Sequence, residues 1–128
     1  MCKTLTLQIF IGKANMFAVI YRFELKPHQE EKYQQCWNVI VDYFKGKRGA
    51  IGSCLHKSAD GLWVAYSRWP SRAARDAAWL GDDASDEDLP FEIKQTIKQM
   101  QKIKEENYDL QQYDEIGLEV IEDKLLQY

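Results

Sequence analysis

Alternating and aromatic-rich runs along the chain predict four strands. The run from Met16 to Leu25 is rich in aromatic and β-branched residues, and Lys26-Pro27 ends it because proline cannot donate a hydrogen bond to a neighbouring strand. Two further runs, Ala50 to Lys57 and Leu62 to Trp69, flank an Asp-Gly pair typical of a tight turn. We expect them to form an antiparallel hairpin. Tyr113 to Leu126 alternates apolar and polar residues, which predicts a half-buried strand.

Three segments between these strands have the spacing of helices. From His28 to Phe44, apolar side chains recur at helical intervals, and Gly46 and Gly49 are expected to end this helix. The segment from Pro70 to Leu80 opens with proline and serine, which is typical of a helix start. A further helix is predicted from Pro90 to near Asn107, where isoleucine and methionine recur at helical spacing.

This order of elements predicts an α+β domain of the ferredoxin-like type, β-α-β-β-α-β, with an antiparallel sheet. Helices cover only one face of such a sheet, so the bare face is expected to pair with a second copy of the chain. We assign residues 16–128 to this domain. Residues 1–15 form either an added edge strand or a disordered extension, and we favour the extension. The acidic stretch from Gly81 to Leu89 is expected to be an exposed loop.

Composition narrows the class of protein. The 128 residues, 45% of them hydrophobic, are enough for one core but not for two ordinary domains. The 17 basic and 20 acidic residues give a net charge of -3 and form no basic stripe, which argues against nucleic acid as a partner. No window approaches the roughly 20 apolar residues of a spanning helix, so no membrane association is expected.

The cysteines indicate the compartment. Cys2, Cys36 and Cys54 form neither a complete set of pairs nor a C-x-x-C spacing, which argues against a disulfide framework and a structural zinc site. The N-terminal segment also lacks the features of a signal peptide. We therefore expect a cytoplasmic protein in which Cys36 and Cys54 are small, buried apolar side chains.

One passage resembles a known family. SRWPSRAARDAAWL, residues 67–80, resembles the place in antibiotic biosynthesis monooxygenase (ABM) domains where the third strand closes with a tryptophan and a helix begins. With the opening strand FAVIYRFEL, the resemblance extends from Met16 to Leu126. It implies a dimeric α/β barrel, in which two sheets pack face to face and each subunit keeps a pocket between sheet and helices. The family includes cofactor-independent quinone-forming monooxygenases, haem-degrading enzymes and isomerase-like proteins, so the fold alone does not define the chemistry.

No bound cofactor is expected. Haem-degrading members carry an asparagine, a tryptophan and a histidine at positions that correspond here to Tyr21, Trp79 and Leu89, so only the tryptophan matches. Many other members carry a histidine at the Trp79 position, and an indole cannot act as a general base. The chain has only His28 and His56, with no carboxylate motif at metal spacing, so no metal site is expected.

Four aromatic residues are candidates for a ligand site. Side chains alternate along a strand, and the resemblance places Tyr21 on the face toward the helices. Trp37, Trp69 and Trp79 lie on or beside the covering helices, so these four side chains would line a pocket for a flat, apolar molecule. The alternative is that they are ordinary core aromatics that fill the space.

Three residues are candidates for catalysis. Tyr66 and Arg68 end the third strand, and Arg72 and Arg75 follow at the start of the next helix. A guanidinium at that point would hold a carboxylate, phenolate or quinone oxygen. The alternative is that the arginines pair with acidic residues at the surface. His56 is the imidazole that would serve as a base, unless it is a structural or surface residue.

These observations leave three functions open. In the first, a homodimer oxidises a small aromatic or apolar ligand with O₂ and no cofactor, Arg68 or Tyr66 stabilising the ligand anion. In the second, the same pocket binds or senses a metabolite without turnover, as a stress-response module would. In the third, the dimer is purely structural and its own aromatics fill the pocket, which predicts no space between Tyr21, Trp37 and Trp79.

Overall fold

A computed structural model describes residues 16–78 and 88–125. Their elements, in order, are the strand β1 (Phe17–Phe23), the short 3-10 helix η1 (Pro27–Gln29), the helix α2 (Glu30–Lys47), the hairpin strands β2 (Gly52–Lys57) and β3 (Trp63–Trp69), the helices α3 (Arg72–Ala78) and α4 (Phe91–Glu106), and the strand β4 (Ile116–Glu119). This order confirms the ferredoxin-like α+β fold that the sequence predicts. The predictions for residues 1–15 and for most of the acidic stretch lie outside the described residues.

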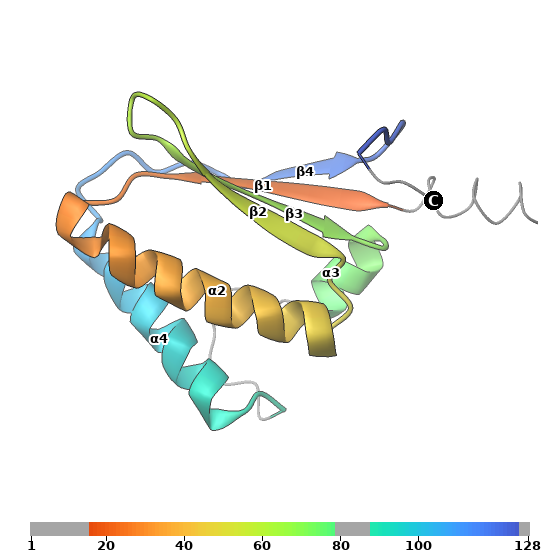
Figure 1. Cartoon of the computed structure of the whole chain (residues 1–128), viewed down its shortest axis with the longest axis horizontal. Coiled ribbons are helices and arrows are strands. Elements are labelled where there is room, and N and C mark those ends of the chain that lie inside the picture. Colours follow the sequence, from red (N-terminus) through yellow and green to blue (C-terminus); the bar gives the residue numbers. More distant parts are fainter. Residues whose placement is uncertain (1–15, 79–87, 126–128) are drawn as a thin grey trace, which may run out of the picture.

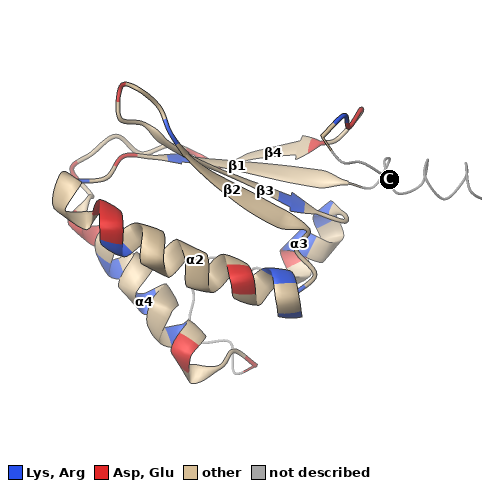
Figure 2. Ribbon diagram, viewed as in Figure 1, with Lys and Arg blue, Asp and Glu red and all other residues tan. Residues whose placement is uncertain are grey.

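The fold has two layers (Figure 1). The four strands form one antiparallel sheet in the order β2-β3-β1-β4. The helices α2 and α4 lie against each other beneath one face of this sheet, and α3 lies at one end of it. No described helix covers the opposite face, which we call the open face. Figure 2 shows that charged residues concentrate on the helices and turns, whereas most of the sheet is uncharged.

Strand alternation divides the sheet residues between the two faces. On β1, Phe17 and Val19 point toward the helices and pack in the core, and Val19 is fully buried. They pair across β3 with Trp69 and Ser67, which therefore share that face. The core is completed by apolar side chains from the helices and from the ends of the sheet: Ile40, Phe44, Ala78, Leu89, Ile93 and Ile97.

Three sequence predictions require correction. The first helix does not end at Gly46 but continues to Lys47, because a single glycine costs only about 1 kcal/mol and packing offsets it. The chain turns instead at Gly49, whose φ of 82° is accessible to glycine at little cost. The last strand is much shorter than predicted, only Ile116–Glu119. Cys54 is exposed because it lies on β2, an edge strand, and points to the open face; Cys36 is buried as predicted.

The segment after β4 is tied to the open face. The Val120 amide donates to the Met16 carbonyl, and the Asp123 carboxylate accepts a hydrogen bond of 2.5 Å from Arg68. Both partners of this ion pair are buried, with 8% of the Arg68 side chain and 2% of the Asp123 side chain exposed. The ion pair therefore holds the segment after β4 against the open face. Among the described residues, no helix has the length and apolar character needed to cross a membrane.

Candidate functional site

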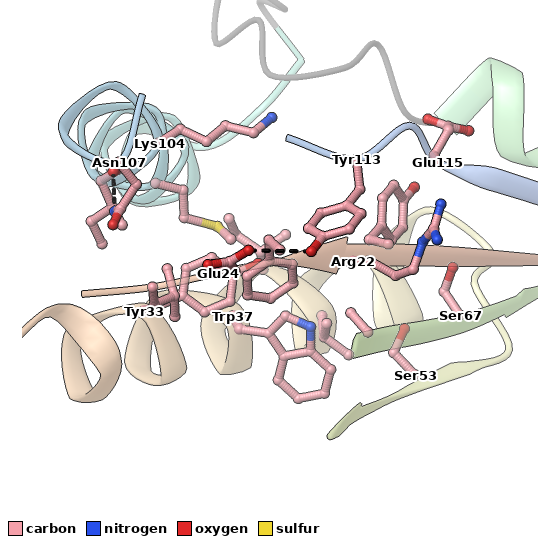
Figure 3. A pocket seen from close by; sticks show the side chains of 18 of the residues that line it. Arg22, Glu24, Tyr33, Trp37, Ser53, Ser67, Lys104, Asn107, Tyr113 and Glu115 are labelled. Atoms are coloured by element: carbon pink, nitrogen blue, oxygen red, sulfur yellow. Dashed lines mark hydrogen bonds between the residues drawn. The ribbon is translucent and has the colours of Figure 1, made fainter. Parts of the chain in front are cut away.

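A pocket of about 450 Å³ lies between the sheet and the two covering helices (Figure 3). Its floor comes from β1, β2 and β3, and its roof comes from α2 and α4. Residues 111–115, which connect α4 to β4, line one side. Pockets of this volume, walled mainly by apolar and aromatic side chains, are typical small-molecule sites.

The pocket exists because small side chains occupy its floor. At positions where the sheet faces the helices, Ser53, Ala65 and Ser67 take places that large apolar residues usually fill. Larger rings border the space, including Phe44 and Trp69, whose ring centroids are 6.5 Å apart in an edge-to-face arrangement. In the sequence, the signal for this cavity is a pair of small residues, Ala65 and Ser67, at alternate positions of β3. Sequence reasoning missed this signal.

Three of the four predicted ligand-binding aromatics line the pocket. Tyr21 lies on the floor, Trp37 is part of the roof, and Trp69 ends β3 at the pocket wall. Trp79 lies outside the described residues. The open volume beside Tyr21 and Trp37 argues against the alternative in which the chain's own aromatics fill this space. Whether these side chains bind a ligand stays a prediction.

Arg75, from α3, contacts two residues that line the pocket, Tyr21 and Glu115. Its Nη2 donates to the Tyr21 hydroxyl at 3.0 Å and to the two carboxylate oxygens of Glu115 at 2.8 and 2.7 Å. Burial alone would lower the pKa of the Arg75 guanidinium, but its bonds to Glu115 and Tyr21 outweigh this and raise that pKa. Arg75 is therefore a fixed cation that orients the Tyr21 hydroxyl.

A second polar pair borders the pocket near residues 111–115. The Tyr113 hydroxyl donates to the Glu24 carboxylate at 3.2 Å, and the Arg22 guanidinium lies 5.2 Å from the centre of the Tyr113 ring. Burial and the Glu24 carboxylate both raise the pKa of Tyr113, so its hydroxyl stays protonated at neutral pH. Figure 3 shows the hydrogen bond between these two side chains. Sequence reasoning identified neither Tyr113 nor Glu24.

The predicted catalytic residues lie on the other side of the sheet. Arg68, Tyr66 and His56 all point to the open face, because they occupy the strand positions that alternate with those of the floor. Arg68 donates to the Tyr66 hydroxyl at 3.3 Å as well as to Asp123. His56 is exposed, and its Nδ1 lies 3.1 Å from the Val64 carbonyl oxygen. The sheet therefore separates these three side chains from the pocket.

Three arginines that are close in the sequence, Arg68, Arg72 and Arg75, lie at different places in the fold. Arg68 points to the open face, whereas Arg75 contacts pocket residues from α3. Arg72 takes a third position, with its guanidinium 4.8 Å from the centre of the Phe17 ring. Within residues 16–78 and 88–125, no group of three or more histidine, cysteine or acidic side chains is arranged as metal ligands.

Fold and pocket together define the class of protein: a ferredoxin-like α+β domain with a small-molecule-sized pocket beneath the sheet. Neither a family model nor a curated protein sequence matches the chain. Solved structures with the same architecture include proteins of the antibiotic biosynthesis monooxygenase type, so the chain has the fold of ABM domains, as the sequence passage implies.

Three of these similar structures indicate how far the likeness extends. SnoaB from Streptomyces nogalater, a cofactor-independent oxygenase solved as a mutant, has a TM-score of 0.61 at 11% identity, over 88% of this chain and 100% of SnoaB. Rv0793 from Mycobacterium tuberculosis has a TM-score of 0.58 at 18% identity, over 85% and 98%. A Caulobacter crescentus protein provisionally assigned as an antibiotic biosynthesis monooxygenase has a TM-score of 0.59 at 12% identity, over 91% and 99%. At these identities the likeness shows the fold.

Proposed function

We propose that this protein binds a small, flat and largely apolar molecule in the pocket beneath its sheet. The observation that carries this proposal is a cavity of about 450 Å³ with aromatic walls in a domain whose core is otherwise packed. A pocket of this size that opens to solvent can admit a small molecule, and its aromatic walls favour a flat ring.

We further propose cofactor-independent oxidation of this ligand by O₂ as the activity to test first. SnoaB, which shares the fold, is a cofactor-independent oxygenase. A phenol that becomes a quinone supplies all the electrons that dioxygen requires: one oxygen atom enters the ring and the other leaves as water. The ligand must first lose its phenolic proton, which passes to water in the open pocket, and the Tyr21 hydroxyl, which accepts a hydrogen bond from Arg75, would donate one to the resulting anion.

The second candidate function is binding without turnover. It is favoured by the absence of histidine among the described residues that line the pocket. The Glu24 carboxylate could serve as a base there, but it already accepts a hydrogen bond from the Tyr113 hydroxyl. A binding module would need no base, and it would release its ligand unchanged. Oxygen uptake in the presence of a ligand that binds distinguishes the two functions.

Filling the pocket should abolish binding. Ala65 lies on the floor and is buried, so the Ala65→Phe side chain would occupy the cavity. We expect quinols and polyphenols to change the fluorescence of the native protein to saturation, and Ala65→Phe to weaken this binding by at least about tenfold. The matched control is Ala59→Phe, an exposed position in the hairpin turn, which should bind as the native protein does. Equal affinity in native protein and folded Ala65→Phe would contradict the proposed site.

We propose that the partner of the open face is a second copy of this chain. Ile20 and Ile116 pair across β1 and β4 on that face, and Leu118 beside them is 41% exposed. A monomer would leave these apolar strand positions in water, whereas a two-fold pairing of sheets buries them on both copies. The proposed setting is the cytoplasm, which the free thiols of Cys36 and Cys54 support.

A charge on the open face should separate the two copies. A symmetric interface contains each substitution twice, so Leu118→Asp would bury two unpaired carboxylates. We expect native mass spectrometry to give a dimer for the native chain, and Leu118→Asp to raise the dissociation constant by roughly 100-fold or more. Phe91→Asp, a 74% exposed position at the start of α4, is the control and should remain dimeric. If the native chain is monomeric, the proposal that a second copy covers the open face is wrong.

A further inference from the structure

The side of the pocket made by residues 111–115 differs from its other walls, and we call this segment the strap. The floor strands are joined by continuous pairing, and α2 and α4 have the internal hydrogen bonds of helices. The strap is neither helix nor strand, and within the described part of the chain its backbone forms no hydrogen bond with another backbone group. Segments of this kind open at a lower free energy than the paired elements of a fold.

Both ends of the strap are fixed. Before it, Asn107 is buried, and the Leu110 amide donates to the Asn107 carbonyl at 3.0 Å. After it, Ile116 pairs with Ile20 of β1. The Gln112 side chain donates only to carbonyls of the turn before the strap, so it does not tie the strap across the pocket. A movement of the strap would therefore hinge at these two ends, as lids do.

Tyr113 provides the first anchor of the strap. Its hydroxyl donates to Glu24, which follows β1, and Figure 3 shows the Tyr113 side chain pointing toward this carboxylate. Arg22 lies beside the Tyr113 ring and donates to the Asp114 carbonyl at 3.4 Å. These are side-chain contacts of half-exposed groups, and each stabilises the closed strap only slightly.

Glu115 provides the second anchor. Its carboxylate, 45% exposed, accepts from the same Nη2 atom of Arg75 that donates to the Tyr21 hydroxyl. The position of the strap and the orientation of Tyr21 therefore depend on one guanidinium. If the strap moves away, Arg75 loses the carboxylate that holds it beside Tyr21.

We propose that the strap is a lid of the pocket, with the hydrogen bond between Tyr113 and Glu24 as its latch and the ion pair between Glu115 and Arg75 as its second anchor. Closing the lid holds Arg75 against Tyr21, so the same movement encloses the ligand and orients the Tyr21 hydroxyl. The role of the lid rests on the proposed function, since it acts on a ligand in the pocket. Its movement does not require a ligand.

NMR relaxation dispersion on the ligand-free protein tests the movement. We expect exchange between microseconds and milliseconds at the amides of residues 111–115, and none at Val19 or Ala65 in the sheet. Tyr113→Phe keeps the ring and removes the latch hydroxyl, so it should raise the open population by about fivefold. Tyr108→Phe, at a 79% exposed position in the turn before the strap, is the matched control and should change nothing. Flat profiles at the strap in both the native protein and Tyr113→Phe would overturn the lid.

Stopped-flow fluorescence with naphthol as the probe tests the latch. A latch limits entry and exit equally, so Tyr113→Phe should raise the association and dissociation rate constants by the same factor, about fivefold, and leave Kd within about twofold. If Tyr113 instead holds the ligand by contact, only the dissociation rate constant rises and Kd weakens with it, and the latch is wrong. If naphthol does not bind to the native protein, the proposed function fails for a flat phenol, whereas the relaxation experiment still decides whether the lid moves.

Discussion

Asn107→Ala is expected to lower the free energy of unfolding by about 3 kcal/mol. The Asn107 side chain is buried at the end of α4, where its amide group donates to Gln29 at 2.5 Å and to the Ile103 carbonyl at 2.6 Å. Its oxygen accepts the Lys26 backbone N–H at 3.0 Å. Each such bond contributes about 1 kcal/mol, and alanine would leave the Oε1 atom of the buried Gln29 without this donor, although its amide group still donates to Glu106.

Urea unfolding followed by circular dichroism measures this loss. Gln112→Ala is the control, because Gln112 also donates two hydrogen bonds in this region, to the Asn107 and Leu110 carbonyls, but is exposed. It should change the free energy of unfolding by less than about 0.5 kcal/mol. A loss below about 1 kcal/mol for Asn107→Ala would mean that water replaces these bonds at little cost. Asn107 also lines the pocket, so the same bonds hold α4 over the floor.

The order of elements could be predicted because the signals for it are local. Aromatic and β-branched runs indicated β1 and β3, and the Asp-Gly pair indicated the hairpin, whose Gly61 has the expected positive φ of 92°. The bounds were less predictable where distant contacts decide them. The prediction carried the last strand on to Leu126, but β4 ends at Glu119 and, beyond it, Asp123 pairs with Arg68 of β3.

The aromatic walls of the site could be predicted from the family resemblance, which places Tyr21 on the face toward the helices, whereas alternation only divides the residues of β1 into two faces. The polar groups of the site could not be predicted from the sequence. Arg68 and Arg75 are close in sequence, but Arg68 ends up on the open face and Arg75 reaches Tyr21 from a helix. Ser67 was overlooked because a small polar residue in a strand usually signals solvent, and only the packed helices show that its face is buried.

The sequence analysis considered ion pairs of these arginines only at the surface, whereas the Arg68–Asp123 pair is buried, and the second large effect follows from this. Asp123→Asn should lower the free energy of unfolding by about 3 kcal/mol, because the guanidinium of Arg68 would remain buried without a countercharge. In the native chain burial alone would lower the pKa of Arg68, and its bonds to Asp123 and Tyr66 instead raise that pKa. A guanidinium stays protonated in proteins even without such a partner, so the variant keeps the buried charge.

A double variant without either charge separates the effect of charge from the effect of side-chain shape in this pair. Arg68→Met combined with Asp123→Leu removes both charges and keeps apolar volume at both positions, so it should recover most of the stability that Asp123→Asn loses. Asp76→Asn is the control, since Asp76 is exposed and its contact with Arg75 is 3.4 Å; its effect should be within about 0.5 kcal/mol. If Asp123→Asn is equally mild, the segment after β4 detaches easily and Arg68 becomes solvated. In that case hydrogen exchange at the Val120 amide would be fast in the native chain as well, because its bond to the Met16 carbonyl depends on the same segment.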